Sequence, residues 1–324
     1  MKYYVGIDLG GTNIKAGIVS EQGEIVCKKS VKTNLESDVR VVRDMAAIAK
    51  AVIAESGIAP AEVCSVGIGA PGTPDNVKGY MEYANNLPFL KTPVRDIMKE
   101  SLTYPIYIDN DANCAAMAES EAGAAKGILN SVTITIGTGL GCGVIINGRI
   151  YSGFNQAGSE FGHVSIVRDG YPCTCGRRGC FEAYASATGL IRLTLDMAKA
   201  HPESILGKRI AANGGKASGR HAFEAMREGD SFAAAVVDDY IEYLSEGLAN
   251  IINAFMPEVL VVGGGVCNEG DPLMIPLIEK TMSKPYFGPG VKRTEIRIAK
   301  MGNDAGIVGA AMMGKACFDD GFVG

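Results

Sequence analysis

Three closely spaced cysteines follow a histidine in the middle of the chain. They lie in the run Cys173-Thr-Cys-Gly-Arg-Arg-Gly-Cys180, and His163 stands ten residues upstream of the run. Thiolates and imidazole are ligands that zinc prefers, and four of them complete the closed tetrahedral coordination of a structural site. We therefore interpret His163, Cys173, Cys175 and Cys180 as ligands of one structural Zn²⁺. A closed site leaves no position for a catalytic water, so we expect the metal to hold its neighbours Glu160 and Glu182 in place.

Two alternatives to the zinc site exist, a disulfide with one cysteine left over and a set of unrelated core thiols. The other six cysteines are scattered singly, and no signal peptide precedes them. This pattern is typical of a reducing compartment, in which clustered cysteines bind metal more often than they form bridges. We therefore prefer the metal site and expect a cytoplasmic protein.

Length and charge limit the remaining possibilities. A chain of 324 residues exceeds what one hydrophobic core usually supports, so we expect two domains. The net charge of -5, without a run of lysine or arginine, argues against nucleic acid and anionic membrane surfaces as partners. No apolar stretch is long enough to span a membrane. No helix-turn-helix pattern precedes the first expected strand, so we expect no DNA-binding domain.

Two glycine-rich turns between strands could bind phosphate. The first joins the expected strands Tyr3–Leu9 and Ile14–Val19 through Gly10, Gly11, Thr12 and Asn13. Backbone N–H groups in such a turn can point at phosphate oxygens, although the first turn taken alone is better explained as a plain hairpin turn. The carboxylate of Asp8 favours a magnesium–nucleotide site.

The second turn repeats this pattern in the other half of the chain. Gly137, Thr138 and Gly139 lie within the expected hairpin Val132–Ile146. Asn147-Gly148 then predicts a further tight turn. Two such hairpins suggest two similar domains that bind one nucleotide.

A candidate general base follows the expected strand Ile106–Ile108. Asp111 stands at the start of an alanine-rich helix that we expect to reach about Ala125. It could simply cap that helix. The helix N-terminus would also favour its ionised form, which could accept a proton from an alcohol that attacks a γ-phosphorus.

The remaining elements are expected from periodicity and composition. We expect a loop-like segment from Gly69 to Pro88 and an exposed, polar excursion from His201 to Asp230. The helices and strands that we expect are Ser37–Glu55, Val63–Ile68, Phe181–Ala200, Phe232–Phe255, Glu258–Val262 and Ala305–Met313.

In sequence order, these motifs resemble those of the ROK (repressor, open reading frame, kinase) sugar kinases. The matching motifs are Asp8-Leu-Gly-Gly-Thr12, Gly69-Ala-Pro-Gly72, Asn110-Asp-Ala-Asn113, Gly137-Thr-Gly-Leu-Gly141, Glu160-Phe-Gly-His163, the Cys173 to Glu182 run, Val261-Val-Gly-Gly-Gly-Val266 and Asp304-Ala-Gly306. The resemblance implies an α/β, actin-like ATPase (ribonuclease H-like) fold with two α/β domains around a cleft. We expect the domains at 1–120 with 304–324 packed back on it, and at 121–303.

The resemblance also implies roles for individual residues. Asp111 matches the catalytic base that takes the proton of a sugar 6-hydroxyl. The residues implied to bind the sugar are Pro71, Gly72, Asn86, Asn110, Asp111, Glu160, His163 and Glu182. Those implied to bind ATP with Mg²⁺ are Asp8, Gly10, Gly11, Thr12, Asn13, Gly137, Thr138, Gly139, Gly264 and Gly265. The family implies a homodimer or homotetramer with a small-molecule sugar as substrate.

Glucose is the expected sugar, because Asn155 to His163 is similar to the corresponding segment of bacterial ROK glucokinases. An N-acetylhexosamine kinase is the alternative within the enzyme class, and a catalytically silent sugar sensor is the alternative outside it. The segment departs from the family pattern at Ser159, where we expect glycine or a similarly small residue. The phosphoryl donor, whether ATP, another nucleotide or polyphosphate, stays open at this point.

Overall fold

The computed structural model divides the chain into two compact units. It describes residues 1–286, 288 and 290–322, so 287, 289 and the last two residues of the expected 304–324 segment lie outside the described part. Unit 1 comprises Met1–Thr133, Gly143–Ser159 and Ala299–Gly324, and unit 2 comprises Ile134–Cys142 and Glu160–Ile298.

Unit 1 is built on a five-stranded sheet with the order β3-β2-β1-β4-β8. Its strands are β1 Tyr3–Leu9, β2 Asn13–Ser20, β3 Ile25–Lys32, β4 Val63–Ala70 and β8 Ile106–Asn110. β1 is antiparallel to β2 and parallel to β4, and β4 is parallel to β8. The carboxyl ends of β1, β4 and β8 therefore meet at one edge, where Asp8, Pro71 and Asp111 lie.

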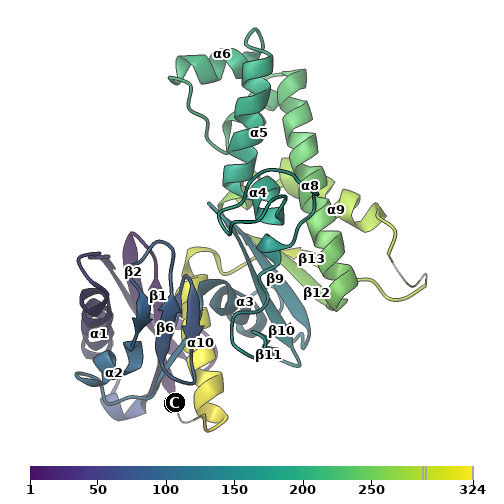
Figure 1. Cartoon of the computed structure of the whole chain (residues 1–324). Coiled ribbons are helices and arrows are strands. Elements are labelled where there is room, and N and C mark those ends of the chain that lie inside the picture. The colour runs from purple at the N-terminus through teal and green to yellow at the C-terminus, as the bar shows by residue number, and fades with distance from the viewer. Residues whose placement is uncertain (287, 289, 323–324) are drawn as a thin grey trace. The chain divides into compact units, whose positions relative to one another are not determined.

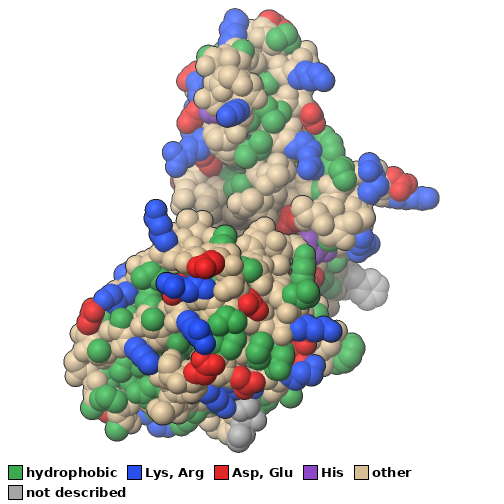
Figure 2. Space-filling view, turned by 60° about the vertical axis from the view of Figure 1, so that its left-hand side comes forward, with side chains coloured by type: hydrophobic (Ala, Val, Ile, Leu, Met, Phe, Trp, Pro, Cys, Tyr) green, Lys and Arg blue, Asp and Glu red, His purple; other side chains and the backbone are tan. Residues whose placement is uncertain are grey.

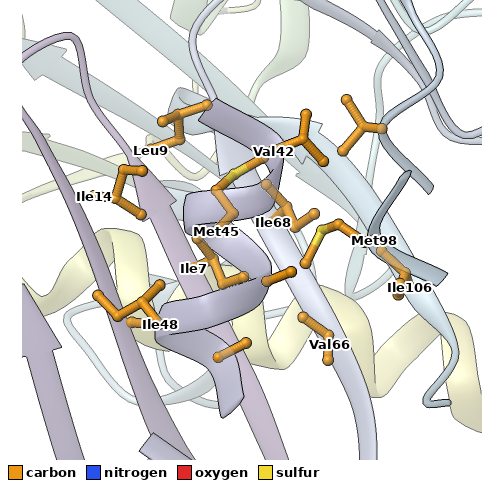
Figure 3. Packing of buried hydrophobic residues seen from close by; sticks show 14 of the residues in the cluster. Ile7, Leu9, Ile14, Val42, Met45, Ile48, Val66, Ile68, Met98 and Ile106 are labelled. Carbon is orange, nitrogen blue, oxygen red and sulfur yellow. The ribbon is translucent and has the colours of Figure 1, made fainter. Parts of the chain in front are cut away.

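Helices cover both faces of this sheet (Figure 1). On one face, α1 Asp38–Glu55 and α2 Val94–Lys99 pack on the sheet, and the buried side chains of α1 recur at helical spacing. Figure 3 shows this core, in which Val42 and Met45 of α1 contact the isoleucines of the strands. On the other face lie α3 Asp111–Glu121 and α10 Ala305–Asp319.

Three glycines let α10 approach the backbone of the sheet. Gly6 pairs with Gly17 on β2 and with Gly67 on β4, so the three form a row across neighbouring strands. A Cβ atom on Gly6 would lie 1.9 Å from the carbonyl oxygen of Ile307, and one on Gly67 would lie 1.8 Å from that of Ala310. The absence of side chains along this row therefore sets the depth at which α10 packs.

A small antiparallel sheet follows β4, where we expected a loop. It has the order β5-β6-β7, with β5 Thr73–Asp75, β6 Tyr80–Tyr83 and β7 Leu90–Thr92. The expected loop from Gly69 to Pro88 is therefore only partly irregular, because β5 and β6 lie within it. Pro74 is tolerated because β5 is an edge strand of this sheet.

A second five-stranded sheet has the order β11-β10-β9-β12-β13. Its strands are β9 Ser131–Ile136, β10 Leu140–Ile146, β11 Arg149–Ile150, β12 Val259–Gly263 and β13 Glu295–Ile298. The division between the two units passes through β9 and β10. The sequence prediction of a strand, glycine turn and strand between Val132 and Ile146 is confirmed.

Unit 2 is rich in helices. They are α4 Phe181–Ala185, α5 Ala187–Ala200, α6 Ile205–Ala212, α7 His221–Arg227, α8 Ser231–Phe255 and α9 Asp271–Ser283. The expected single helix from Phe181 to Ala200 is interrupted at Ser186, whose side chain caps α5. The expectation of an exposed excursion after His201 was wrong, because α6 and α7 bury Leu206 and Phe223.

Two further features concern the helices and the charged side chains at the surface. In the described residues, no helix is long and apolar enough to cross a membrane. Figure 2 shows basic and acidic side chains interspersed over the face that it presents, in line with the net charge of -5.

Candidate functional site

The first glycine turn is held in shape by its own backbone and by β3. The N–H of Gly10 donates to the carbonyl oxygen of Asn13 (2.9 Å), and the hydroxyl of Thr33 donates to the carbonyl oxygen of Gly10 (2.7 Å). Gly11, Thr12 and Asn13 are exposed. The turn therefore presents accessible backbone, as phosphate binding requires.

Asp8 stands at the end of β1 next to this turn. The alternation of the strand turns it to the same face as Gly6, and the hairpin register places it opposite Lys15, whose Nζ lies 3.2 Å from Asp8 Oδ2. A Cβ atom on Gly306 would lie 2.4 Å from Asp8 Cγ. Lys15 and the first turn of α10 thus fix the position of the Asp8 carboxylate.

Asn110, and not Asp111, caps α3. The Asn110 side chain accepts from the N–H of Ala112 (2.8 Å), and its Nδ2 donates to the carbonyl oxygen of Gly72 (3.0 Å). Asp111 is the first helical residue, is exposed, and accepts from the same N–H of Ala112 (2.9 Å). The cap of α3 therefore does not depend on Asp111, which leaves its carboxylate accessible for chemistry.

Two carboxyl groups at the end of β8 have raised pKa values. The surrounding protein limits the hydration of Asp111 and, together with the negative charge of Asp8, raises the pKa of the Asp111 carboxyl. Burial raises the pKa of Asp109 to about 6, although its Oδ1 accepts hydrogen bonds from Asn113 Nδ2 and the N–H of Asn110. A raised pKa makes Asp111 a stronger base than an ordinary carboxylate once it is ionised.

Gly72 and Asn86 lie near these groups in unit 1. Gly72 has φ +113°, and a Cβ atom there would lie 2.2 Å from the carbonyl oxygen of Tyr83, so only glycine fits. The exposed Asn86 follows β6, and its carbonyl oxygen lies 3.8 Å from the Cβ position of Gly11. The sugar candidates Gly72 and Asn110 are thus joined directly, and Asn86 lies beside the first glycine turn.

In unit 2, the second glycine turn is tied to α4 and α5. Glu182 Oε2 accepts from the N–H of Leu140 (2.9 Å), and the N–H of Ala187 donates to the carbonyl oxygen of Gly137 (2.9 Å). The hydroxyl of Thr188 donates to the carbonyl oxygen of Thr138 (2.7 Å). One carboxylate oxygen of Glu182 is therefore already bonded to this turn.

Gly264 also approaches this region of unit 2. It has φ +100°, and a Cβ atom on it would lie 2.4 Å from the carbonyl oxygen of Ile136, the last residue of β9. The exposed Gly264–Gly265 pair therefore lies next to the second glycine turn.

The four predicted metal ligands converge. The ligand atoms of His163, Cys173, Cys175 and Cys180 all lie within 4.8 Å of one another. Cys173 Sγ is 3.5 Å from His163 Nδ1, and Cys175 Sγ is 3.6 Å from Cys180 Sγ. Tetrahedral zinc at its usual bond lengths separates sulfur from nitrogen by about 3.5 Å and two sulfurs by about 3.8 Å. The donor set and its spacing therefore fit one zinc ion, with Nε2 of His163 left for another partner.

The segment Glu160–His163 packs against the second glycine turn in unit 2. A Cβ atom on Gly162 would lie 2.4 Å from the carbonyl oxygen of Leu140 and 3.7 Å from Glu182 Cβ. Glu160, His163 and Glu182 thus lie close together within unit 2. The remaining sugar candidates, including Asp111 and Pro71, lie in unit 1.

Two residues near the candidate site, Lys15 and Asp109, and the contact that Gly306 makes with Asp8 escaped the sequence analysis. Lys15 could have been found from the hairpin, because a turn at Gly10–Thr12 fixes Asp8 and Lys15 as partners. Asp109 directly precedes the Asn110-Asp111 pair, but sequence alone does not reveal its burial. The contact of Gly306 with Asp8 joins distant parts of the chain and leaves no local signal.

Comparison with known proteins gives consistent matches along nearly the whole chain. The model of the ROK family matches residues 4–316. A glucokinase from Halalkalibacterium halodurans is 36% identical over 317 residues, which cover 97% of this chain and 95% of that protein.

Solved structures give the same result. The ROK hexokinase from Thermus thermophilus has a TM-score of 0.84 at 32% identity, covering 98% of this chain and 99% of the other. A ROK family glucokinase from Streptomyces griseus, in complex with glucose and AMPPNP, has a TM-score of 0.79 at 33% identity, covering 97% and 99%. The α/β, actin-like ATPase fold expected from the sequence is confirmed.

Proposed function

The chain belongs to the ROK family, and on this premise we propose that it is an ATP-dependent hexose kinase that phosphorylates the 6-hydroxyl of glucose. The observation that carries the proposal is the similarity, over almost the whole chain, to glucokinases. The bound glucose and AMPPNP of the Streptomyces griseus relative support both the sugar and the donor.

Asp111 is the proposed general base. Its carboxylate is exposed, is not needed as the helix cap, and has a raised pKa. It accepts the proton of the sugar 6-hydroxyl while the hydroxyl oxygen bonds to the γ-phosphorus and the bond from that phosphorus to ADP breaks. This reaction requires positioning and charge neutralisation more than covalent catalysis.

Two groups of residues position the reactants in this proposal. The sugar is bound by Pro71, Gly72, Asn86, Asn110, Glu160, His163 and Glu182. The phosphates and adenosine of ATP are bound by the two glycine turns, Gly10–Asn13 and Gly137–Gly139, and by Gly264 and Gly265. Asp8 would hold the Mg²⁺ that accompanies ATP, and a bound ion there would supply positive charge against the phosphates. Carboxylates suit pairs of sugar hydroxyls because each can accept two hydrogen bonds.

The zinc ion is the proposed structural cofactor. His163, Cys173, Cys175 and Cys180 would hold it, and their atoms have the spacing of a tetrahedral site. When bound, zinc fixes the orientation of the His163 ring, so that Nε2 is available to the sugar. Its contribution is therefore to sugar recognition and to stability.

The proposal extends to the location and the oligomeric state of the protein. The nine cysteines are all free, as in proteins of a reducing compartment, and this supports a cytoplasmic location. A homodimer or homotetramer stays a prediction from the family, to be measured by light scattering.

A coupled assay of ADP release tests the proposed function. The purified protein receives Mg²⁺-ATP with glucose, mannose, fructose, N-acetylglucosamine, N-acetylmannosamine or allose. We expect the highest kcat/KM with glucose. A preference for an acetamido sugar would assign an N-acetylhexosamine kinase instead. Binding of a sugar without turnover would indicate a sensor or a different phosphoryl donor. Repeating the assay with polyphosphate in place of ATP distinguishes these two cases, because turnover with polyphosphate would identify it as the donor.

A further inference from the structure

The segment that leads into Glu160 contains two residues in an unusual backbone conformation. Gln156 has φ +61° and Ser159 has φ +67°, a region that favours glycine. The departure of Ser159 from the expected glycine thus falls where the backbone itself prefers glycine. Such strain persists only where other interactions hold the conformation, and it is common at ligand sites.

Both side chains form hydrogen bonds that glycine could not provide. The hydroxyl of Ser159 donates to the carbonyl oxygen of Tyr151 (2.6 Å), so this bond joins the two ends of the segment 151–159. Gln156 Oε1 accepts from the backbone N–H of Asn76 (2.6 Å), eighty residues earlier in the chain. The second bond therefore fixes the middle of the segment to the β5–β6 turn.

Asn76 is itself fixed to the strand that precedes Asp111. Its Oδ1 accepts from the N–H of Ile108 on β8 (2.9 Å), and its carbonyl oxygen accepts from Nη2 of Arg95 (2.5 Å). Arg95 is buried, and its Nε donates to the carbonyl oxygen of Ile106, also on β8 (3.0 Å). Hydrogen bonds thus run without a gap from Gln156 to the strand that ends immediately before Asp111.

We propose that Gln156 is a positioning residue for sugar recognition, because it fixes the segment in front of Glu160 to Asn76 and so holds the Glu160 carboxylate where the sugar requires it. This inference rests on the proposed function, in which Glu160 binds the sugar. It assigns an individual role to Gln156, which the sequence analysis names only as part of the segment from Asn155 to His163. A carboxylate that must meet two hydroxyls tolerates little displacement, so loss of this support weakens sugar binding more than nucleotide binding.

Three substitutions at Gln156 separate this role from a purely structural one. Gln156→Gly suits the backbone but removes the acceptor, and Gln156→Asn keeps the amide but is one methylene too short. Gln156→Glu keeps an acceptor at the same reach. We expect the first two to raise the Kd and KM for glucose about tenfold or more, with the KM for ATP within about twofold of wild type. The Gln156→Glu variant should bind glucose with a Kd within about threefold of the wild-type value.

The matched control is Asn147→Gly. Asn147 also has positive φ, +52°, but lies in the β10–β11 turn. This variant should relax the backbone in the same way without changing either KM. The midpoint of thermal unfolding should not fall in Gln156→Gly, since glycine relieves strain as the hydrogen bond is lost.

Three results would overturn the inference. The first is a glucose Kd of Gln156→Gly within about twofold of wild type, and the second is an equal rise of the KM for glucose and the KM for ATP in that variant together with a lower melting temperature. The third is a glucose Kd of Gln156→Glu as high as that of Gln156→Gly. Glucose binding is measured by calorimetry without nucleotide, so the test does not depend on turnover. Wild-type protein that binds but does not phosphorylate glucose would contradict the proposed function alone. Wild-type protein that binds no glucose would overturn both.

Discussion

At the scale of single residues, the position of Asp111 at the start of α3, directly after β8, determines its chemistry. Asn110 takes the cap of α3, so the carboxylate of Asp111 is available to a substrate. We expect Asp111→Asn to lower kcat by about 10²- to 10⁴-fold, because the proton of the attacking hydroxyl loses its acceptor. The glucose Kd should change by no more than a few-fold. Steady-state kinetics and calorimetry measure the two effects.

The surface substitution Asp44→Asn is the control for this variant. It removes a carboxylate that pairs with Arg40 on α1 and should leave kcat unchanged. A kcat of Asp111→Asn close to that of wild type would remove Asp111 as the base.

The raised pKa of Asp111 predicts the direction of the pH dependence. The base must be ionised, so activity falls as the pH falls through the pKa of this carboxyl. Since limited hydration and the charge of Asp8 raise that pKa, the midpoint of the acidic limb of kcat/KM should lie above the ordinary value of 3.8. Activity should return fully when the enzyme is brought back to neutral pH. A midpoint at or below 3.8 would contradict this environment for Asp111.

At the scale of elements, the row of glycines under α10 is the feature with the largest expected effect on stability. A Cβ atom on Gly67 would lie 1.8 Å from the carbonyl oxygen of Ala310, and neither backbone can move without disturbing the sheet or the helix. We expect Gly67→Ala to lower the free energy of unfolding by roughly 3 kcal/mol or more. Urea unfolding measures this change.

Gly219→Ala is the matched control for Gly67→Ala. Gly219 has ordinary φ, and its Cβ atom would have only a normal contact with Leu190 at 3.8 Å. The control should remain within about 0.5 kcal/mol of wild type. Equal effects of the two substitutions would show that α10 does not depend on the glycine row.

The proposed metal site of His163, Cys173, Cys175 and Cys180 is the second element whose removal can be tested. Chelation of the metal, or Cys175→Ser, should lower the melting temperature and raise the KM for glucose, because His163 and Glu182 lose their support. The KM for ATP should change less. Elemental analysis should find about one zinc per chain in wild type and markedly less in the variant. Cys27→Ser, which removes a thiol outside the cluster, should change none of these values.

The elements also show which parts of the fold sequence reasoning can reach. The β1–turn–β2 hairpin and α1 were predicted because their periodicity and turn residues are strong local signals. Helices α6 and α7 were missed because they are short, and tertiary burial of Leu206 and Phe223 stabilises them more than local propensity does. The convergence of His163, Cys173, Cys175 and Cys180 was predicted from their spacing, whereas the Gln156–Asn76 bond joins residues that no local pattern connects.

At the scale of the whole molecule, both compact units contribute residues to the proposed chemistry. Asn110 and Asp111 belong to one unit, and Glu160, His163 and Glu182 belong to the other. A sugar bound by all of these residues stabilises the segments of both units that carry them. Glucose at 100 times its Kd should add about 2.7 kcal/mol to the free energy of unfolding, since it binds the folded protein and not the unfolded chain.

Hydrogen exchange locates this stabilisation. With glucose at that concentration, we expect slower exchange both in the first turn of α3 and in the segment 160–163, while the exposed ends of α6 should exchange as before. Sorbitol at the same concentration is the control for non-specific effects of polyols and should protect neither segment. Protection of only one segment would show that the sugar is bound by the residues of one unit alone. The residue roles assigned to the other unit would then have to be withdrawn, while the fold and the family membership would stand.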